Sequence, residues 1–353
     1  MMLPEEWPGA ADAADPNSPT RSAGRDRLAT VRADFFLHPG ERLTEQERAL
    51  MTAMLHSLVG DIADEVRAAL PSSMSAANDD RNLALLETLA SVRLLDRPVL
   101  VRLLLRRADE ERIATAATAR SGRREARVLQ GLVSHEDGAI AAAAMALILA
   151  RGRRRDRFGQ SLLHFDDLNA DEGRVLIHLI CAALRADAAG VLGAAEADRR
   201  LATAAEQVLA SHDPGSGMDA LTATLVRLLA EDEDLSDELI VTAAIEGEMT
   251  FVAHALSARS GVRADVAMDE LLSGSERRAM AMLRTANVSR TVAASLLAGV
   301  GDLIGIPDPG RAIDAFDRLT DAEVEDVRAW LTTEPAYRRA VTSLGSSYGK
   351  RTL

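Results

Sequence analysis

The sequence contains very few residues of the types that carry disulfide, zinc-binding or base-stacking chemistry. Cys181 is the single cysteine among 353 residues, which excludes an intramolecular disulfide and an all-cysteine zinc site. Aromatic residues make up only 3% of the chain. This scarcity argues against a large β-sandwich core and against a surface that stacks nucleic-acid bases. Lysine occurs only at Lys350, so nearly all of the positive charge is arginine.

Long apolar runs are also missing. The longest one covers 139–150, whereas a membrane-spanning helix needs about 20 apolar residues. The opening segment Met1–Trp7 is acidic and contains proline, so we expect no signal peptide. The net charge of −13 favours solubility and repels nucleic acid. We therefore expect a cytoplasmic protein with no membrane span, for which nucleic acid is an unlikely partner.

What the sequence does contain is apolar residues at helical spacing. Hydrophobic residues make up 47% of the chain, enough for a substantial core. Thr44 and Glu47 have the spacing of a capping box, in which each side chain satisfies an amide at a helix start. Asn169 with Glu172, and Thr320 with Glu323, repeat this spacing. No segment shows sustained two-residue alternation of β-branched residues, so no sheet is expected. The pattern predicts an all-α protein.

The helices are expected to pair and stack. Six apolar residues are matched at a constant offset of 26, which suits one helix pair with tight turns. They are Ala253, Leu256, Val262, Val266, Ala267 and Leu271, matched by Ala279, Met282, Val288, Val292, Ala293 and Leu297. A single pair cannot bury its own apolar face, but stacked pairs share one. The sequence therefore predicts stacked antiparallel helix pairs in a short HEAT-like α-solenoid.

The domain organisation follows from composition. Residues 1–24 are rich in proline and small polar residues and are predicted to be disordered. The helical array is expected over 25–345, with a subdivision allowed near 152–160 or near 212–217. The tail 346–353 is predicted to be loose.

Several segments resemble a bacterial family catalogued as domain of unknown function two-three-three-six. They include FFLHPGERLTEQERALMTAMLHSLVGDIADEVRAAL at 35–70 and AIAAAAMALILA at 139–150, which follows HEDG. The others are LLSGSERRAMAMLRTANVSRTVAASLL at 271–297 and AIDAFDRLTDAEVEDVRAWLTTEPAYRRA at 312–340. The resemblance covers nearly the whole chain after residue 25. It implies an all-helical, HEAT-like fold, a bacterial cytoplasmic setting and regulatory or scaffolding work. It transfers no catalytic residue.

Motifs for catalysis and for cofactors are not found in the sequence. There is no phosphate-binding GxxxxGK[ST] loop, no GxSxG and no HExxH. His56 lies on an amphipathic helix, as phosphorelay histidines do, but the surrounding motif is missing and an exposed structural histidine is the favoured interpretation. Neighbouring carboxylates such as Asp166-Asp167 point away from each other on a helix and are interpreted as solvated. We expect no enzymatic activity, no cofactor and no metal.

Two arginine clusters are the strongest candidates for a binding site. In a solenoid, successive loops fall on one edge, so the two clusters together could form a positive strip that binds phosphate groups. The alternative is a solvated loop whose arginines pair with nearby acids for little gain in stability. The candidate residues are Arg123, Arg124, Arg127, Arg151, Arg153, Arg154, Arg155 and Arg157.

These observations lead to two hypotheses of different class. The leading hypothesis is a non-enzymatic scaffold or regulatory adaptor that binds another protein through the concave face of stacked helices. The alternative is a sensor of a phosphate or nucleotide ligand that uses the arginine-rich edge.

Overall fold

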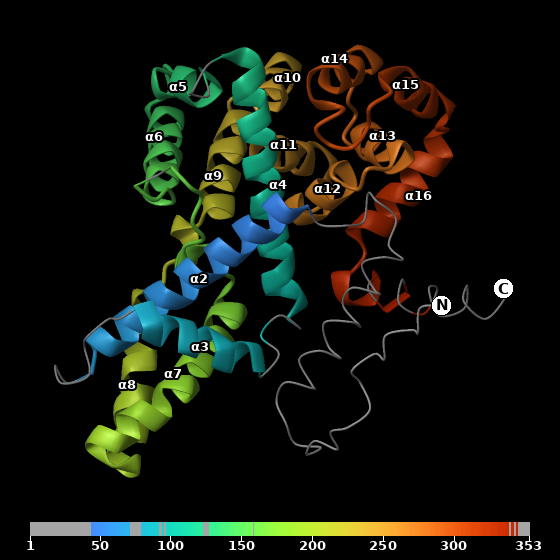
Figure 1. Cartoon of the computed structure of the whole chain (residues 1–353). Helices are drawn as coiled ribbons and strands as arrows, with labels where there is room; N and C mark the ends of the chain where they lie inside the picture. Colours follow the sequence, from blue (N-terminus) through green and yellow to red (C-terminus); the bar gives the residue numbers. More distant parts are fainter. Residues whose placement is uncertain are drawn as a thin grey trace, which may run out of the picture. The chain divides into compact units, whose positions relative to one another are not determined.

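The computed structural model describes residues 44–70, 79–91, 94, 97–122, 127–157, 159–338, 340–341 and 344. The predicted segments 1–24 and 346–353 lie outside these residues. Over the described part of the chain the fold is all-α, as predicted, and the only strand-like pairing is an isolated bridge between Arg155 and Ser161. Helices α2 to α16 all belong to one compact unit (Figure 1).

The helices fall into longer and shorter members. The longer ones are α2 (Glu45–Ala68), α3 (Asp79–Ser91), α4 (Pro98–Ser121), α6 (Gly138–Arg153), α7 (Ala170–Leu192), α8 (Ala194–Ser211) and α9 (Met218–Glu231). The shorter ones are α5 (Arg127–Val133), α10 (Asp237–Ile245), α11 (Met249–Ser260), α12 (Ala264–Leu271), α13 (Glu276–Thr285), α14 (Arg290–Val300), α15 (Pro309–Arg318) and α16 (Asp321–Thr332). Two 3₁₀ turns, η4 (Phe165–Asp167) and η5 (Pro214–Ser216), connect α6 to α7 and α8 to α9.

Side-chain caps fix where several helices begin. Thr320 and Glu323 form a complete capping box at the start of α16. At α7, Asn169 accepts a hydrogen bond from the Glu172 amide at 2.8 Å, but the box is only half formed. The Glu172 carboxylate is instead bound by Arg97, whose Nη2 donates to it at 2.9 Å. The Glu172 side chain therefore binds Arg97, which is distant in sequence, and does not accept from the Asn169 amide as a complete capping box requires.

The buried apolar residues form two clusters. The first core, Met54–Leu104 together with Leu163–Val208, is formed by α2, α3, the start of α4, α7 and α8. The second core, Ile113–Ala150 together with Met218–Leu331, is formed by the rest of α4, α5, α6 and α9 to α16. The all-α class is confirmed. A solenoid with one continuous interior is not confirmed, because polar residues separate these two clusters.

The chain passes between the two cores three times. The first passage is inside α4, between Leu104 and Ile113; in Figure 1, α4 runs from α3 and α7 toward α5 and α10. The other two are the connections at 151–162 and 209–217. The predicted subdivision near 152–160 or 212–217 stays a prediction, although both segments lie where the chain changes core.

The 26-residue offset describes local structure. α12 and α14 begin at Ala264 and Arg290, which are 26 residues apart. The turns that precede them adopt left-handed backbone at Gly261 and Asn287, residue types that tolerate this conformation. The packing is not repeated, since α11 packs on α12 whereas α13 packs on α15 and α16. Similar helices are therefore placed in different surroundings.

One helix among the described residues, α7, is long and apolar enough to cross a membrane. Length and composition alone are weak evidence for a span, because the core helix of a globular protein passes the same test. Here α7 packs against α8, α3 and α2 and buries Leu176, Ile177 and Ile180 in the first core. These contacts bury one face of α7 in the first core.

Candidate functional site

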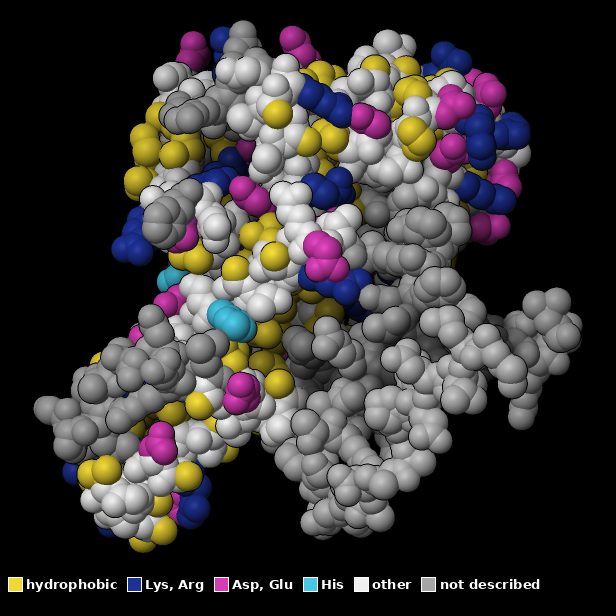
Figure 2. All heavy atoms as spheres, in the orientation of Figure 1, with side chains coloured by type: hydrophobic (Ala, Val, Ile, Leu, Met, Phe, Trp, Pro, Cys, Tyr) yellow, Lys and Arg dark blue, Asp and Glu magenta, His cyan; other side chains and the backbone are white. Residues whose placement is uncertain are grey.

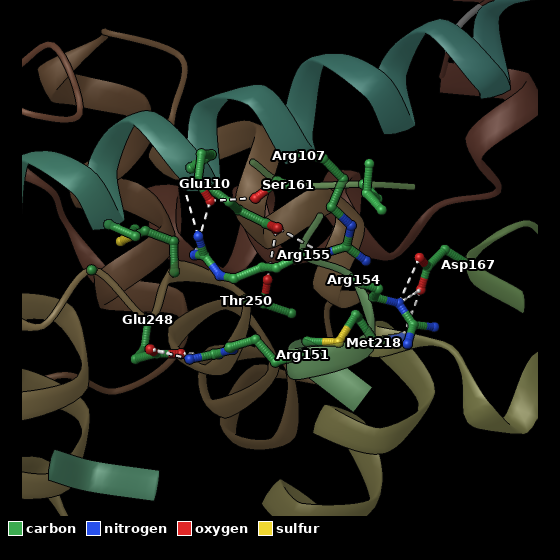
Figure 3. Close-up of a pocket in the computed structure, with 15 residues that line it drawn as sticks. Arg107, Glu110, Arg151, Arg154, Arg155, Ser161, Asp167, Met218, Glu248 and Thr250 are labelled. Carbon is green, nitrogen blue, oxygen red and sulfur yellow. Dashed lines mark hydrogen bonds and ion pairs between the residues drawn. The ribbon is translucent and has the colours of Figure 1, made fainter. Parts of the chain in front are cut away.

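The three passages between the cores bring charged residues together in the interior. We call this set the charged junction, and Figure 3 shows most of it. Its members are Arg107, Glu110, Glu111, Arg151, Arg154, Arg155, Asp167, Asp219 and Glu248. They come from α4, the end of α6, η4, α9 and the residue before α11. Buried charges are stable only when they are paired and hydrogen-bonded, so each contact matters.

Arg154 and Asp167 form the most buried pair. Their side chains are 8% and 1% exposed, and Arg154 Nε lies 2.8 and 3.0 Å from the two Asp167 oxygens. Arg154 also donates to the carbonyl of Ser216 at 3.2 Å. Asp167 in turn accepts from the Met218 amide at 2.9 Å. This pair therefore ties the second passage of the chain to the third.

Arg151 and Glu248 form a second, partly buried pair, from the end of α6 to the residue before α11, with side chains 33% and 8% exposed. Arg151 Nη1 donates to Glu248 at 2.6 Å, and Nη2 contacts the other carboxylate oxygen. Burial lowers the pKa of the Arg151 guanidinium, but the charge of Glu248, the hydrogen bond to it and the charge of Glu110 together raise the pKa above the ordinary value. Arg151 is therefore a fixed positive charge.

Arg107 lies on α4 and is only 9% exposed. Its Nη1 donates to Glu110 at 2.6 Å. Its Nη2 is 3.4 Å from Asp219 without the alignment of a hydrogen bond, and both Nη2 and Nε have no hydrogen-bond partner. Burial lowers the pKa of Arg107, but the charges of Glu110 and Asp219 raise it above the ordinary value. Burial would raise the pKa of Asp219, yet Arg107 holds it below the ordinary value.

Arg155 is the exposed member of the charged junction. Its side chain is 41% exposed and pairs with Glu111 of α4 at 3.2 and 3.4 Å. Arg155 also donates to the Gly159 carbonyl at 2.7 Å, and the Ser161 hydroxyl contacts Glu111. Because water screens this pair, it contributes less stability than the buried ones.

A cavity of about 110 Å³ lies among these side chains. Four arginines and four carboxylates of the junction line it, together with Thr250, whose hydroxyl donates to Glu110 at 2.6 Å. Gly247 brings the turn before α11 against α4. Its φ is +81°, and a Cβ there would lie 2.8 Å from the Ala114 Cα. Only glycine fits this close approach without strain.

Two larger cavities adjoin each other along α4, α11, α12 and α16, with volumes of about 700 and 690 Å³. Arg102, Asp265 and Pro335 line both, so we treat them as one feature, the groove. Asp167 and Thr250 line the groove as well as the junction cavity. The groove is therefore next to the charged junction.

The structure divides the arginines that the sequence singled out. Arg151, Arg154 and Arg155 meet in the charged junction, where each has a carboxylate partner. The remaining described candidates are exposed, namely Arg127, Arg153 and Arg157. Arg123 and Arg124 lie outside the described residues. Binding of an anion by these residues stays a prediction.

Six members of the junction were missed from sequence: Arg107, Glu110, Glu111, Asp167, Asp219 and Glu248. The interpretation of Asp167 as solvated was wrong, because its side chain is 1% exposed. For Arg107 the sequence did contain a signal, namely a charged residue at a position of the helix where the apolar pattern predicts burial. Arg107 follows the buried Leu103 and Leu104 by one turn, where a surface arginine would not be expected. Elsewhere the arginines pair on the surface, and Figure 2 shows basic and acidic side chains side by side over α15 and α16.

One further cluster has metal-ligand residue types. His135, Asp232 and Asp234 each place a ligand atom within 4.8 Å of the others. His135 Nδ1 accepts from the Asp137 amide at 3.1 Å, and Nε2 lies 3.0 Å from Asp234. A neutral imidazole has one accepting nitrogen, so Nε2 carries a proton and donates it to Asp234. Both ring nitrogens of His135 are therefore used in hydrogen bonds, and these account for the proximity of the residues without a metal ion.

Fold and site together describe an all-α protein with two apolar cores and a charged junction between them. The model of a family described as an uncharacterised protein conserved in bacteria (DUF2336) matches residues 106–329, more than half of the chain. The chain belongs to this family. The match includes the whole charged junction, but not 35–70, which also resembled the family. Comparison with curated proteins finds no match, and neither does comparison with solved structures.

Proposed function

We propose that this protein is a non-enzymatic binding module of the bacterial cytoplasm, a scaffold or regulatory adaptor that holds a segment of another protein. The observation that supports this most is the groove. Its two adjoining cavities, of about 700 and 690 Å³ along α4, α12 and α16, offer more room than a small molecule needs and suit an amphipathic helix. The remainder of the proposal concerns what such a helix would contact.

The groove includes an exposed aromatic side chain and some apolar neighbours. Trp330 is 38% exposed and lines one cavity of the groove together with Leu331, and Met268 lines the adjoining cavity. Tryptophan is enriched among the residues that dominate binding energy at protein interfaces. An apolar stripe of the partner helix would cover these side chains.

The rim of the groove offers charges of both signs. Arg102 and Asp269 have no hydrogen bond and no ion pair within 4 Å among the described residues. Burial raises the pKa of Asp269, and the charge of Arg102 opposes that rise. The groove therefore favours a partner helix that has charges of both signs beside its apolar stripe.

We infer no catalytic role. In the charged junction, the carboxylates that could act as general acids or bases are bound by arginines. A general base must be free to take a proton from a substrate, and a paired carboxylate is a weak base.

Site-specific photo-crosslinking in the native bacterial cell tests the proposal. A photoreactive residue replaces Trp330 in the groove or, as the matched control, Val191, which is 58% exposed on α7. We expect one protein to be crosslinked from position 330 and not from position 191. Combining Arg102→Glu with Asp269→Lys should remove that product, whereas Arg185→Glu on α7 should not.

Two outcomes would contradict the proposal. One is the same set of products from positions 330 and 191, which indicates contact by collision. The other is a product from position 330 that survives the reversal of both rim charges. The partner's crosslinked peptide, identified by mass spectrometry, also reports whether that segment is amphipathic.

A further inference from the structure

One arginine that lines the cavity of the charged junction has buried donors without acceptors. Among the described residues that line the cavity, only Arg107 has buried side-chain nitrogens, Nε and Nη2, that have no hydrogen-bond partner. A guanidinium can only donate, so what the site is missing is an oxygen. Leaving such donors unsatisfied is costly in the interior of a protein.

Three more guanidinium groups lie around the same space. Figure 3 shows Arg107, Arg151, Arg154 and Arg155 arranged around the cavity, with Thr250 among them. Arginine forks match the oxygens of phosphate and carboxylate groups and form charge-assisted hydrogen bonds with them. The four carboxylates of the lining balance the four arginines in number, so a small anion would meet no net repulsion.

The cavity is large enough for a small anion. A volume of about 110 Å³ accommodates several waters or one tetrahedral oxyanion. Access is through Arg155, whose exposed ion pair with Glu111 can exchange its carboxylate for a ligand oxygen.

We propose that this cavity binds a single phosphate group, contacted by Arg107 and Arg155. The ligand is either inorganic phosphate or the phosphate end of a small phosphomonoester whose remainder extends past Arg155. This site is distinct from the groove and goes beyond the proposed function. It differs from a positive strip on the surface because one of its two arginines, Arg107, is only 9% exposed.

Isothermal titration of the full-length protein with inorganic phosphate tests the proposal at constant ionic strength. We expect saturable binding to one site. Arg155→Gln should weaken it by about tenfold to a hundredfold, which corresponds to the loss of one or two charge-assisted hydrogen bonds. The matched control is Arg185→Gln, which removes an exposed arginine–aspartate pair outside the cavity and should leave the affinity unchanged. Arg107→Gln should abolish binding, with circular dichroism used to verify folding.

Adenosine monophosphate and adenosine distinguish the source of the phosphate. Tighter binding of the monophosphate than of inorganic phosphate, with none of adenosine, identifies a phosphomonoester site. Preference for inorganic phosphate identifies the free ion. No saturation by either phosphate up to about 1 mM, or equal affinities in wild type and Arg155→Gln, overturns the proposal. Water then fills the cavity.

Discussion

Apart from α4, which contributes to both, the two cores of this protein are built from different helices. The first core relies on long helices, of which α2 and α7 have 24 and 23 residues. The second core is assembled largely from helices of 8 to 14 residues, several of them separated by left-handed turns. Long helices bury an extended stripe in one step, whereas short helices depend on neighbours distant in sequence.

The two cores also differ in how much of each lies within the family match. Nearly all of the second core lies within residues 106–329. The first core combines α7 and α8, inside that range, with α2 and α3, which precede it. The second core is thus formed almost entirely by residues within the family match. The first core also needs α2 and α3, which lie before the match begins. The charged junction, entirely within the family match, lies where the two cores meet.

Truncating a large side chain in either core should produce the largest loss of stability. Leu58 and Phe251 are fully buried in the first and second core, respectively. We expect Leu58→Ala to lower the free energy of unfolding by about 2–5 kcal/mol and Phe251→Ala by about 3–5 kcal/mol, since each leaves a cavity. Urea denaturation followed by circular dichroism measures both. Losses below about 1 kcal/mol would mean that the site is not packed as described.

Breaking the buried ion pair tests the junction that separates the cores. Asp167→Asn removes the charge that Arg154 faces while keeping the shape of the side chain. An unpaired buried arginine should lower the free energy of unfolding by about 3–5 kcal/mol. Denaturation of Asp167→Asn beside the control Asp198→Asn, which breaks an exposed pair, measures the difference. Equal effects of the two variants would show that the Arg154 pair is solvated.

Adding a methyl group where α4 meets the turn before α11 should have a smaller effect. Gly247→Ala places a Cβ against the Ala114 backbone at a positive φ, so we expect a loss of about 1–3 kcal/mol. The control is Gly190→Ala on α7, where nothing lies within 4 Å of the added atom. That variant should be stabilised by about 0.5–1 kcal/mol, because alanine favours a helix. Thermal denaturation compares the two, and opposite signs are expected.

Acid should weaken the junction through Asp219. Its folded pKa is lowered from the ordinary value of 3.8, so the ionised carboxylate contributes stability that is complete above that value. This contribution is lost as the pH falls from about 4 toward the folded pKa. The stability of wild type should therefore decrease more steeply below pH 4 than that of Asp219→Asn. Parallel curves from urea titrations at several pH values would refute this linkage.

The smallest effect is expected for an arginine pair on the surface. Arg185 and Asp198 join α7 to α8 with both side chains about half exposed. Arg185→Gln should leave the melting temperature unchanged within error, since exposed pairs contribute little. A clear decrease in the melting temperature would mean that ion pairs stabilise the first core as they stabilise the charged junction.

Local features of the fold could be predicted from sequence. The capping box at Thr320 and Glu323 is found as predicted because its partners are three residues apart. Helical periodicity likewise gave the all-α class. At Asn169 the same spacing formed only half a box, because Arg97, 75 residues away in sequence, binds the Glu172 carboxylate. No feature of the sequence near residue 172 indicates that Arg97 binds this carboxylate.

The site was only partly predictable for the same reason. Arg151, Arg154 and Arg155 are conspicuous because they are neighbours in sequence. Arg107 and Glu248 lie on separate elements far from 151–155 in sequence, and their proximity to that cluster depends on three passages of the chain between the cores. A periodic pattern indicates which side of a helix is buried, but not which distant helix covers it.

Hydrogen exchange of the full-length protein, followed by mass spectrometry, tests most directly whether two cores exist. We predict that Leu58→Ala raises exchange in α7 and α8, with α9 and α11 unchanged, and that Phe251→Ala produces the reverse pattern. Equal increases across α7, α8, α9 and α11 in both variants would contradict the account, because they would show a single cooperative interior.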